Sequence, residues 1–188
     1  MGPVKGSIGN PTIFLDRDGV ITREILRVDG TFGSPRETFE IEFIDQSVRT
    51  LKNYSGLGFN TVVISNQPDI QNNKVQRSTL DQINKQLFEY GHLSAILYCP
   101  HNRNKNCQCR KPKTKMLTWA ASYFGVSPIQ CVMIGDRITD INAAEKFGCE
   151  AIHISDLASS CLDVNHQHFT NLEQSSSYIF RKFNIEIS

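Results

Sequence analysis

The feature that most constrains the fold of this chain is an alternation of short apolar segments with longer helical patterns. Five segments are nearly all apolar and rich in branched side chains, as expected of strands that are covered on both faces. These segments are Thr12–Leu15, Thr61–Ser65, Ala95–Cys99, Cys131–Ile134 and Ala151–Ile154. Helical patterns lie between them, at about Gln46–Ser55, Thr79–Tyr90, Lys115–Phe124 and Ile138–Phe147. The alternation predicts a three-layer α/β domain, in which a Rossmann-like parallel sheet carries helices on both faces.

The two ends of the chain carry weaker signals. Near the C-terminus, the pattern predicts a further strand near His168 and Phe169 and a closing helix at Leu172–Phe183. Residues 1–10 contain no apolar signal region, and we expect them to be disordered or to derive from cloning. A length of 188 residues is typical of one domain, so a single domain over residues 1–188 is expected.

Charge and apolar content exclude several classes of protein. The chain has 20 Lys and Arg against 19 Asp and Glu, and this near balance argues against a protein that wraps nucleic acid. Its longest apolar run, Ala95–Cys99, is far shorter than the roughly 20 residues of a helix that crosses a bilayer. We therefore expect a monomeric cytoplasmic protein that binds a small molecule, with neither nucleic acid nor membrane as a partner.

Polar side chains follow the predicted strands, at the edge of the sheet where parallel α/β proteins bind ligands. Asp16 and Asp18 come directly after the first strand, and Gly19 permits a tight turn there. Two close carboxylates repel each other unless a cation or a shared proton relieves them, and Mg2+ prefers such oxygen ligands. The same pattern also occurs in simple turns and calcium loops, although no EF-hand ligand series follows it here.

Two further strand ends carry polar groups. Ser65 and Asn66 follow the second long strand, where a hydroxyl beside free backbone N–H groups suits a phosphate oxygen, and where a simple turn is the alternative. Asp136 follows the fourth strand, and Arg137 leads from it to Asp140 at the start of a helix. A carboxylate at that position also suits the positive end of the helix dipole, so Asp140 is either a site residue or a capping residue.

Four metal-binding side chains lie at and after the end of the third strand. Cys99 and His101, followed by Cys107 and Cys109, make the ligand set of a structural zinc site with four protein ligands. Segment 102–106 has no apolar side chain that could hold it by burial, so a metal would staple this loop. Unligated thiols on a loop are the alternative. The remaining cysteines are expected to be small buried side chains; they are Cys131, Cys149 and Cys161.

Two basic residues come directly after the cysteine loop. Arg110 and Lys111 are either part of a solvated basic run or are held by the loop over the carboxylates. In the second interpretation, Lys111 neutralises the carboxylates as a point charge, and the planar fork of Arg110 binds an anionic group of the substrate.

Taken in order, these motifs resemble those of the haloacid dehalogenase superfamily of phosphatases. The motifs are Ile-Phe-Leu-Asp-Arg-Asp-Gly-Val around Asp16, Val-Ile-Ser-Asn-Gln around Ser65, Lys111 after the cysteine loop, and Ile-Gly-Asp-Arg-Ile-Thr-Asp from Ile134 to Asp140. The Cys-x-His and Cys-x-Cys-Arg-Lys-Pro pairs narrow the resemblance to a zinc-containing branch with a minimal cap or none. That branch holds the D-glycero-D-manno-heptose 1,7-bisphosphate phosphatases and the histidinol-phosphate phosphatases, and the resemblance covers roughly residues 11–155.

The resemblance implies a Mg2+-dependent phosphomonoester hydrolase that acts through an aspartyl-phosphate. It implies that Asp16 is the nucleophile and that Asp18 is the general acid and base. Mg2+ would be held by Asp16, Asp136 and the backbone carbonyl of Asp18. Ser65 and Lys111 would stabilise the transferring phosphoryl group. The remaining candidates are two substrate-binding residues, Asn66 and Arg110, and two additional site residues, Asp140 and Arg137.

The sequence indicates the substrate less clearly than it indicates the reaction. Segments Ile41–Asp45 and Ser65–Asp69 resemble the heptose phosphatases, whereas the five-residue spacer before Cys107 resembles the histidinol-phosphate phosphatases. We expect removal of the 7-phosphate of heptose 1,7-bisphosphate; the alternatives are histidinol phosphate, another small phosphate or a polynucleotide phosphate. Segment 22–36 matches neither group and is expected to border the substrate. Three clustered acidic residues disfavour a non-catalytic phosphate-binding protein, and the lack of aromatic residues in segment 102–113 disfavours a zinc-knuckle nucleic-acid module.

Overall fold

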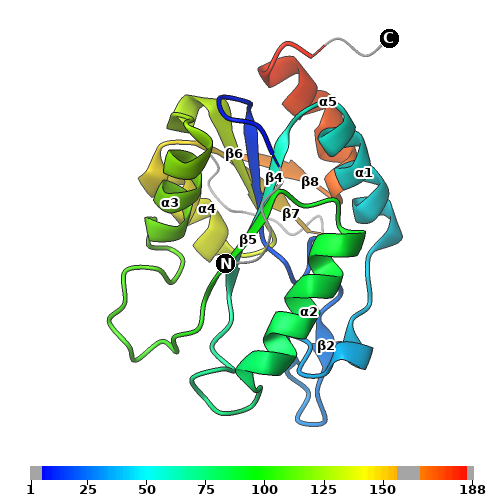
Figure 1. Ribbon diagram of the computed structural model, residues 1–188, viewed down its shortest axis with the longest axis vertical. Coiled ribbons are helices and arrows are strands. Elements are labelled where there is room, and N and C mark those ends of the chain that lie inside the picture. Colours follow the sequence, from blue (N-terminus) through cyan, green and yellow to red (C-terminus); the bar gives the residue numbers. More distant parts are fainter. Residues whose placement is uncertain (1–5, 156–165, 186–188) are drawn as a thin grey trace.

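The computed structural model describes residues 6–155 and 166–185 (Figure 1). Its strands are β1 (Thr12–Leu15), β2 (Ile25–Leu26), β3 (Phe32–Gly33), β4 (Asn60–Asn66), β5 (Ala95–Cys99), β6 (Cys131–Gly135), β7 (Glu150–Ile154) and β8 (Gln167–Phe169). Its helices are α1 (Asp45–Gly56), α2 (Arg77–Tyr90), α3 (Lys115–Phe124), α4 (Ile138–Phe147) and α5 (Leu172–Lys182). Short 3-10 turns occur at Thr38–Glu40 and Pro128–Gln130.

A six-stranded parallel sheet forms the middle layer of the protein. Its strand order is β5-β4-β1-β6-β7-β8, with β1 in parallel register between β4 and β6. Helices α1, α2 and α5 cover one face of the sheet, and α3 and α4 cover the other (Figure 1). Successive side chains of β1 enter opposite cores: Ile13 packs on the side of α1, α2 and α5, and Phe14 packs on the side of α3 and α4. The predicted three-layer Rossmann-like fold is therefore confirmed.

The predicted elements agree with the structure to within two residues at each end. Strands β1 and β5 and helices α3 and α4 have the predicted bounds, and α5 ends one residue before the predicted Phe183. The other predicted elements begin or end one or two residues further out. The predicted C-terminal strand and closing helix are also present, as β8 and α5. This agreement follows from the sequence pattern, because short apolar runs rich in branched side chains are typical of strands in a parallel sheet that is covered by helices.

Residues 7–10, which we expected to lie outside the ordered domain, instead belong to it. The Ser7 N–H donates to Oδ1 of the buried Asn60 (2.9 Å), and Nδ2 of Asn60 donates to the Ser7 carbonyl (2.9 Å). The Gly9 N–H donates to the carbonyl of Phe124 (2.7 Å). A buried amide needs hydrogen-bond partners, and this segment supplies them. Residues 1–5 and the predicted buried Cys161 lie outside the described residues.

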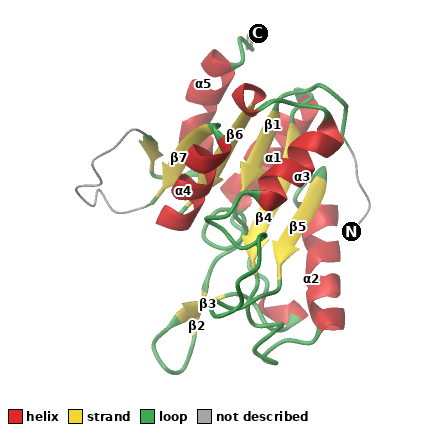
Figure 2. Cartoon of the chain, turned by 90° about the vertical axis from the view of Figure 1, so that its left-hand side faces the viewer, coloured by secondary structure: helices red, strands yellow, loops and turns green. Residues whose placement is uncertain are grey.

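A small antiparallel hairpin of β2 and β3 stands beyond the carboxyl ends of the sheet strands, below the sheet in Figure 2. Its turn is held by Asp29, whose Oδ1 accepts hydrogen bonds from N (3.0 Å) and Oγ1 (2.6 Å) of Thr31. Within residues 6–155 and 166–185 no separate inserted domain accompanies this hairpin, in agreement with the prediction of a minimal cap.

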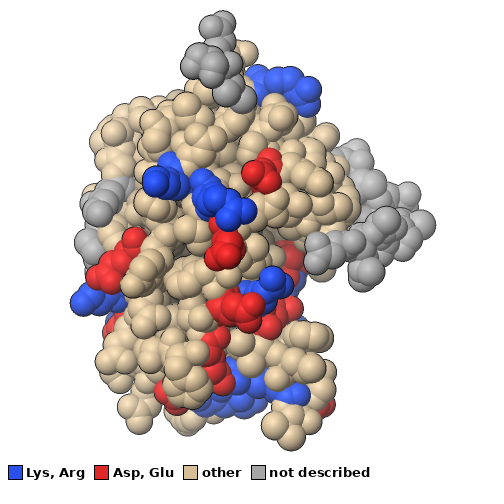
Figure 3. Space-filling model, turned by 90° about the vertical axis from the view of Figure 1, so that its right-hand side faces the viewer, with Lys and Arg blue, Asp and Glu red and all other residues tan. Residues whose placement is uncertain are grey.

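The helices and the surface charges bear on which partners the protein can have. No helix in the described part of the chain has both the length and the apolar character needed to cross a membrane. On the face of α1, α2 and α5, basic and acidic side chains are interspersed among uncharged ones (Figure 3). The expectation that nucleic acid is not a partner stays a prediction.

Candidate active site

The carboxyl ends of neighbouring parallel strands bring the predicted acidic residues together. Asp16 directly follows β1, and Asp136 directly follows β6, which pairs with β1. Gly19 makes this close approach possible, since its φ is +85° and a methyl carbon on its Cα would lie 2.6 Å from Cγ of Asp136. A side chain at position 19 would therefore displace the Asp136 carboxylate.

Lys111 is the buried cation of the site. Its side chain is 1% exposed, and its Nζ lies 3.0 Å from Oδ1 of Asp16 and 2.7 Å from Oδ1 of Asp140. The other oxygen of Asp140 accepts a hydrogen bond from the Arg137 N–H (3.1 Å) at the start of α4. Asp140 is thus both a capping residue and a site residue, because one of its oxygens caps the helix and the other faces Lys111.

Asp16, Asp136 and Asp140 form a carboxylate cluster that can hold a cation. One oxygen from each lies within 4.8 Å of the others. Burial, with the charge of neighbouring carboxylates, raises the pKa of Asp16 to about 6 and the pKa of Asp136 to about 7. Among the described residues, no hydrogen-bond donor reaches the buried Oδ1 of Asp136. Lys111 and the Arg137 guanidinium, which lies 4.0 Å from Oδ2 of Asp136 and also pairs with Glu24, do not balance these carboxylates. The excess negative charge on an oxygen-only donor set fits a hard divalent cation such as Mg2+.

The Asp18 side chain faces a different set of partners. Its Oδ1 accepts hydrogen bonds from Nε of Arg17 (3.0 Å) and Oγ1 of Thr22 (3.1 Å). Its Oδ2 accepts from Nη2 of Arg17 (2.9 Å), Oγ of Ser34 (2.7 Å) and Nε2 of Gln67 (3.2 Å). Burial raises the pKa of Asp18, but the Arg17 charge and these hydrogen bonds outweigh it and hold the pKa below its ordinary value. The side chain of Asp18 is therefore separate from the carboxylate cluster, and its predicted part in the metal site concerns the backbone carbonyl alone.

The Asn66 side chain holds the backbone of Lys111, and its predicted binding of substrate stays a prediction. Its Oδ1 accepts a hydrogen bond from the Lys111 N–H (3.0 Å), and its Nδ2 donates to the Lys111 carbonyl (3.2 Å). A side-chain amide offers one donor and one acceptor side by side, which matches a backbone peptide group. Asn66 therefore joins the end of β4 to the segment after the cysteine loop and fixes the position of Lys111.

Besides Thr22, three residues that the sequence did not single out contact the proposed catalytic groups. Nε2 of Gln67 donates to Oγ of the buried Ser65 (2.8 Å) as well as to Asp18, which leaves the Ser65 hydroxyl hydrogen free for another acceptor. Arg17 and Ser34 complete the set. Arg17 and Gln67 lie within the two motifs around Asp16 and Ser65, and this position is a signal that could have identified them. Ser34 is 16 residues from Asp18 and lies in segment 22–36, which was expected to border the substrate, but nothing within that segment singled out Ser34.

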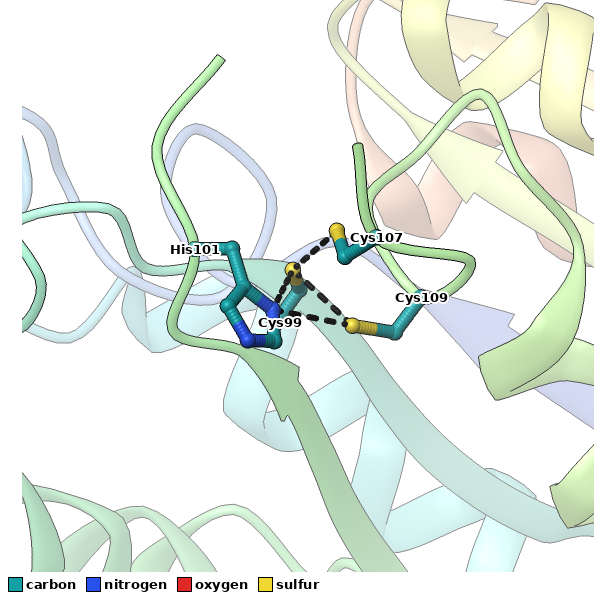
Figure 4. A group of neighbouring side chains, drawn as sticks. All are labelled: Cys99, His101, Cys107 and Cys109. Carbon is teal, nitrogen blue, oxygen red and sulfur yellow. Dashed lines mark hydrogen bonds between the residues drawn. The ribbon is translucent and has the colours of Figure 1, made fainter. Parts of the chain in front are cut away.

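The cysteine and histidine side chains converge at the end of β5 (Figure 4). Sγ of Cys99 lies 3.4 Å from Nδ1 of His101, 3.6 Å from Sγ of Cys107 and 3.2 Å from Sγ of Cys109. These sulfur–sulfur distances are too long for a disulfide, whose bond is about 2.05 Å. The four ligand atoms lie within 4.8 Å of one another, so the group can hold one metal ion.

A cavity of about 1050 Å³ opens over the carboxylate cluster. Ten of its lining residues are Lys or Arg and three are Asp, so it favours an anionic ligand. Arg110 lines this cavity while its Nη1 donates to the His101 carbonyl (2.9 Å), which also braces the cysteine loop. Arg137 lines it as well and forms an ion pair with Glu24.

Comparisons with known proteins agree with this geometry. A family model described as HAD-hydrolase-like matches residues 108–160. The D-glycero-beta-D-manno-heptose-1,7-bisphosphate 7-phosphatase of Haemophilus influenzae is 32% identical over 145 residues, which cover 71% of this chain and 75% of that protein. The chain belongs to the haloacid dehalogenase (HAD)-like hydrolases. It is a phosphoric monoester hydrolase of this family.

Two further proteins are similar to this HAD-like hydrolase. The histidine biosynthesis bifunctional protein HisB of Actinobacillus pleuropneumoniae is 29% identical over 156 residues, which cover 76% of this chain and 39% of that protein. The crystal structure of the D,D-heptose 1,7-bisphosphate phosphatase from B. bronchiseptica, complexed with magnesium and phosphate, has a TM-score of 0.78 at 22% identity. That likeness covers 91% of this chain and 98% of the other, and it shows that the two proteins share a fold.

Proposed function

We propose that this HAD-like hydrolase removes the phosphate from a small sugar phosphate, with the 7-phosphate of D-glycero-D-manno-heptose 1,7-bisphosphate as the first candidate. The observation that carries the proposal is the ion network of Lys111 with Asp16 and Asp140, beside Asp136, at the base of a basic cavity. A substrate with two phosphates suits a cavity with such an excess of cations. The name of the Haemophilus influenzae relative supports the same substrate.

Asp16 is the proposed nucleophile. The Arg17 N–H (2.7 Å) and the Lys111 ammonium (3.0 Å) both contact its Oδ1, which leaves Oδ2 for attack. Oδ2 forms a bond to phosphorus as the bond between phosphorus and the sugar oxygen breaks, which gives an aspartyl-phosphate and an alkoxide. Covalent catalysis divides a very slow hydrolysis into two easier steps.

Asp18 is the proposed general acid and base. This role requires Asp18 to be protonated when the substrate binds, although its partners lower its pKa in the free protein. Asp18 then gives this proton to the departing alkoxide, and it later takes a proton from the water molecule that attacks the aspartyl-phosphate. Attack by water releases inorganic phosphate and restores the carboxylate of Asp16. Asp18 returns to its protonated state in the same step, so one carboxyl group serves both halves of the reaction.

Positive charge around the phosphoryl group lowers the barrier for both steps. Ser65 and Lys111 would donate hydrogen bonds to phosphoryl oxygens as negative charge develops on them. Mg2+, held by Asp16, Asp136 and the backbone carbonyl of Asp18, would offset the repulsion between the attacking carboxylate and the phosphate dianion.

The cysteine and histidine cluster is proposed to hold a structural Zn2+ ion. A site with four protein ligands has no open position for a reacting water molecule, so this ion would hold the loop rather than take part in the chemistry. Cys109 precedes Lys111 by two residues, so fixing Cys109 also restricts where Lys111 lies.

Histidinol phosphate is the second candidate substrate. The similarity to the bifunctional HisB protein favours it, although this chain spans about two fifths of that protein's length. The two candidates differ in charge, since heptose bisphosphate carries a second phosphate where histidinol phosphate carries an amine.

The test is a panel of kcat/KM values at fixed Mg2+, covering heptose bisphosphate, heptose monophosphate, histidinol phosphate and nucleotide monophosphates. We expect heptose bisphosphate to give the highest value, and Asp16→Asn to reduce turnover to background while the far-UV circular dichroism spectrum stays unchanged. A higher kcat/KM for histidinol phosphate than for heptose bisphosphate would make histidinol phosphate the first candidate substrate. Substantial phosphatase activity of folded Asp16→Asn would remove the nucleophile assignment.

A further inference from the structure

One hydroxyl from the segment after the β2–β3 hairpin contacts the proposed acid and base. Oγ of Ser34 lies 2.7 Å from Oδ2 of Asp18, although the two residues are 16 positions apart in the chain. Ser34 and Asp18 both line the catalytic cavity, whereas Arg17, the strongest partner of Asp18, has a side chain that is only 1% exposed. Ser34 is therefore the Asp18 partner that lies on the substrate side.

We propose that Ser34 is a positioning residue, which holds the Asp18 carboxyl group in the orientation from which it exchanges a proton with the leaving group. The inference rests on the proposed function, because it assigns to Ser34 a part in the proton transfer at Asp18. It also gives a task to the segment 22–36, which follows neither of the two related groups of phosphatases in sequence.

The chemistry of the five hydrogen bonds to Asp18 singles out Ser34. The guanidinium of Arg17 and the amide nitrogen of Gln67 can only donate, so they stabilise Asp18 as a carboxylate. A hydroxyl can donate to a carboxylate and can also turn to accept a hydrogen bond from a carboxyl O–H. Ser34 can therefore follow Asp18 through both states of the reaction. Thr22 has the same ability, but it contacts Oδ1 and is fully buried.

The hairpin fixes the position of this hydroxyl. Nη2 of Arg27 donates to the backbone carbonyl of Ser34, and the Arg27 guanidinium also binds both carboxylate oxygens of Glu40 (2.8 and 3.2 Å). Both ion-pair partners are mostly buried, with 15% and 21% of their side chains exposed. The backbone of Ser34 is thus tied to Arg27, directly after strand β2, and through Arg27 to the 3-10 turn at Thr38–Glu40.

The test is how the effect of Ser34→Ala on kcat/KM depends on the leaving group of the substrate. Ser34→Ala and the wild-type protein would be compared by kcat/KM on an alkyl ester, the best sugar phosphate of the panel, and on 4-nitrophenyl phosphate. The alkoxide must be protonated as it departs, whereas the nitrophenolate departs without a proton. Because kcat/KM covers the steps up to departure of the leaving group, Ser34→Ala should lower it about tenfold for the alkyl ester and less than about twofold for the aryl ester.

Two further variants separate positioning from a change in the hairpin. Ser34→Thr keeps the hydroxyl and should restore the alkyl-to-aryl ratio of the wild type. Thr31→Ala removes the Oγ1 hydrogen bond to Asp29 in the same hairpin, without touching Asp18, and should change both esters equally. Equal losses on the two esters in Ser34→Ala, or no loss on either, would overturn the assignment while leaving the proposed function intact. If the wild type hydrolyses neither ester, the proposed function itself fails.

Discussion

Gly19→Ala is the substitution whose consequences follow most directly from the structure. The backbone at Gly19 has a φ of +85°, a conformation that costs an L-residue about 1–2 kcal/mol. The added methyl carbon would also lie 2.6 Å from Cγ of Asp136. Ordinary carbon–carbon contact is about 3.5–4.0 Å, so the carboxylate must move away by about 1 Å.

Gly9→Ala is the matched control. Gly9 has nearly the same φ, +82°, and an added methyl carbon there would meet nothing within 4 Å. Both variants therefore carry the backbone cost, and only Gly19→Ala displaces Asp136. A misplacement of about 1 Å at a catalytic centre can lower activity about 100-fold.

Urea unfolding and steady-state kinetics would measure the two effects separately. We expect both variants to lose about 1–2 kcal/mol of unfolding free energy from the backbone. Gly19→Ala should in addition bind Mg2+ more weakly, by isothermal titration calorimetry, and lose about 100-fold in kcat/KM. If Gly19→Ala matches Gly9→Ala in Mg2+ affinity and in kcat/KM, the argument from close approach is refuted.

Three further predictions follow from the charges and ligands of the site. Because the pKa is raised to about 6 for Asp16 and to about 7 for Asp136, these two carboxyl groups bind more protons in the folded metal-free chain than in the unfolded chain. Its unfolding free energy should therefore fall as pH rises from about 4 to about 7, and the increase in Tm with Mg2+ should be larger at pH 8 than at pH 5; an equal increase contradicts the argument. Lys111→Met should cost roughly 3–5 kcal/mol in chemical unfolding, since it leaves buried carboxylates without their cation; a loss below about 1 kcal/mol contradicts this. Elemental analysis should find about one zinc per chain, lost in Cys107→Ser and kept in Cys149→Ala, and a metal-free, folded and active wild type would contradict a structural zinc.

The positions of the main site residues were predictable because each follows a strand whose own position was predictable. Asp16 and Asp136 come directly after apolar runs that are central strands, and parallel strands present their carboxyl ends at one edge. Lys111 joins them from a loop, and its approach was predictable from the order of the motifs and from the ligand pairs that precede it.

What the sequence did not reveal are contacts between single polar side chains. Ser34 reaches Asp18 across 16 residues with no periodic pattern between them, so no rule of spacing points to it. The two hydrogen bonds between the Asn66 amide and the Lys111 backbone were likewise not predictable, because the two residues are 45 positions apart in the chain. Segment 7–10 was set aside by composition, although a buried amide at Asn60 depends on it.

The double hydrogen bond between Asn66 and the Lys111 backbone also bears on how this enzyme can change in evolution. Because the lysine is tethered to a rigid strand, its place does not depend on the length of the polar segment 102–106 between the two ligand pairs. Doubling the length of a flexible loop adds only about 0.6 kcal/mol of closure entropy. Insertions there can therefore reshape the rim of the cavity, and with it the choice of substrate, while the catalytic ammonium group stays where it is.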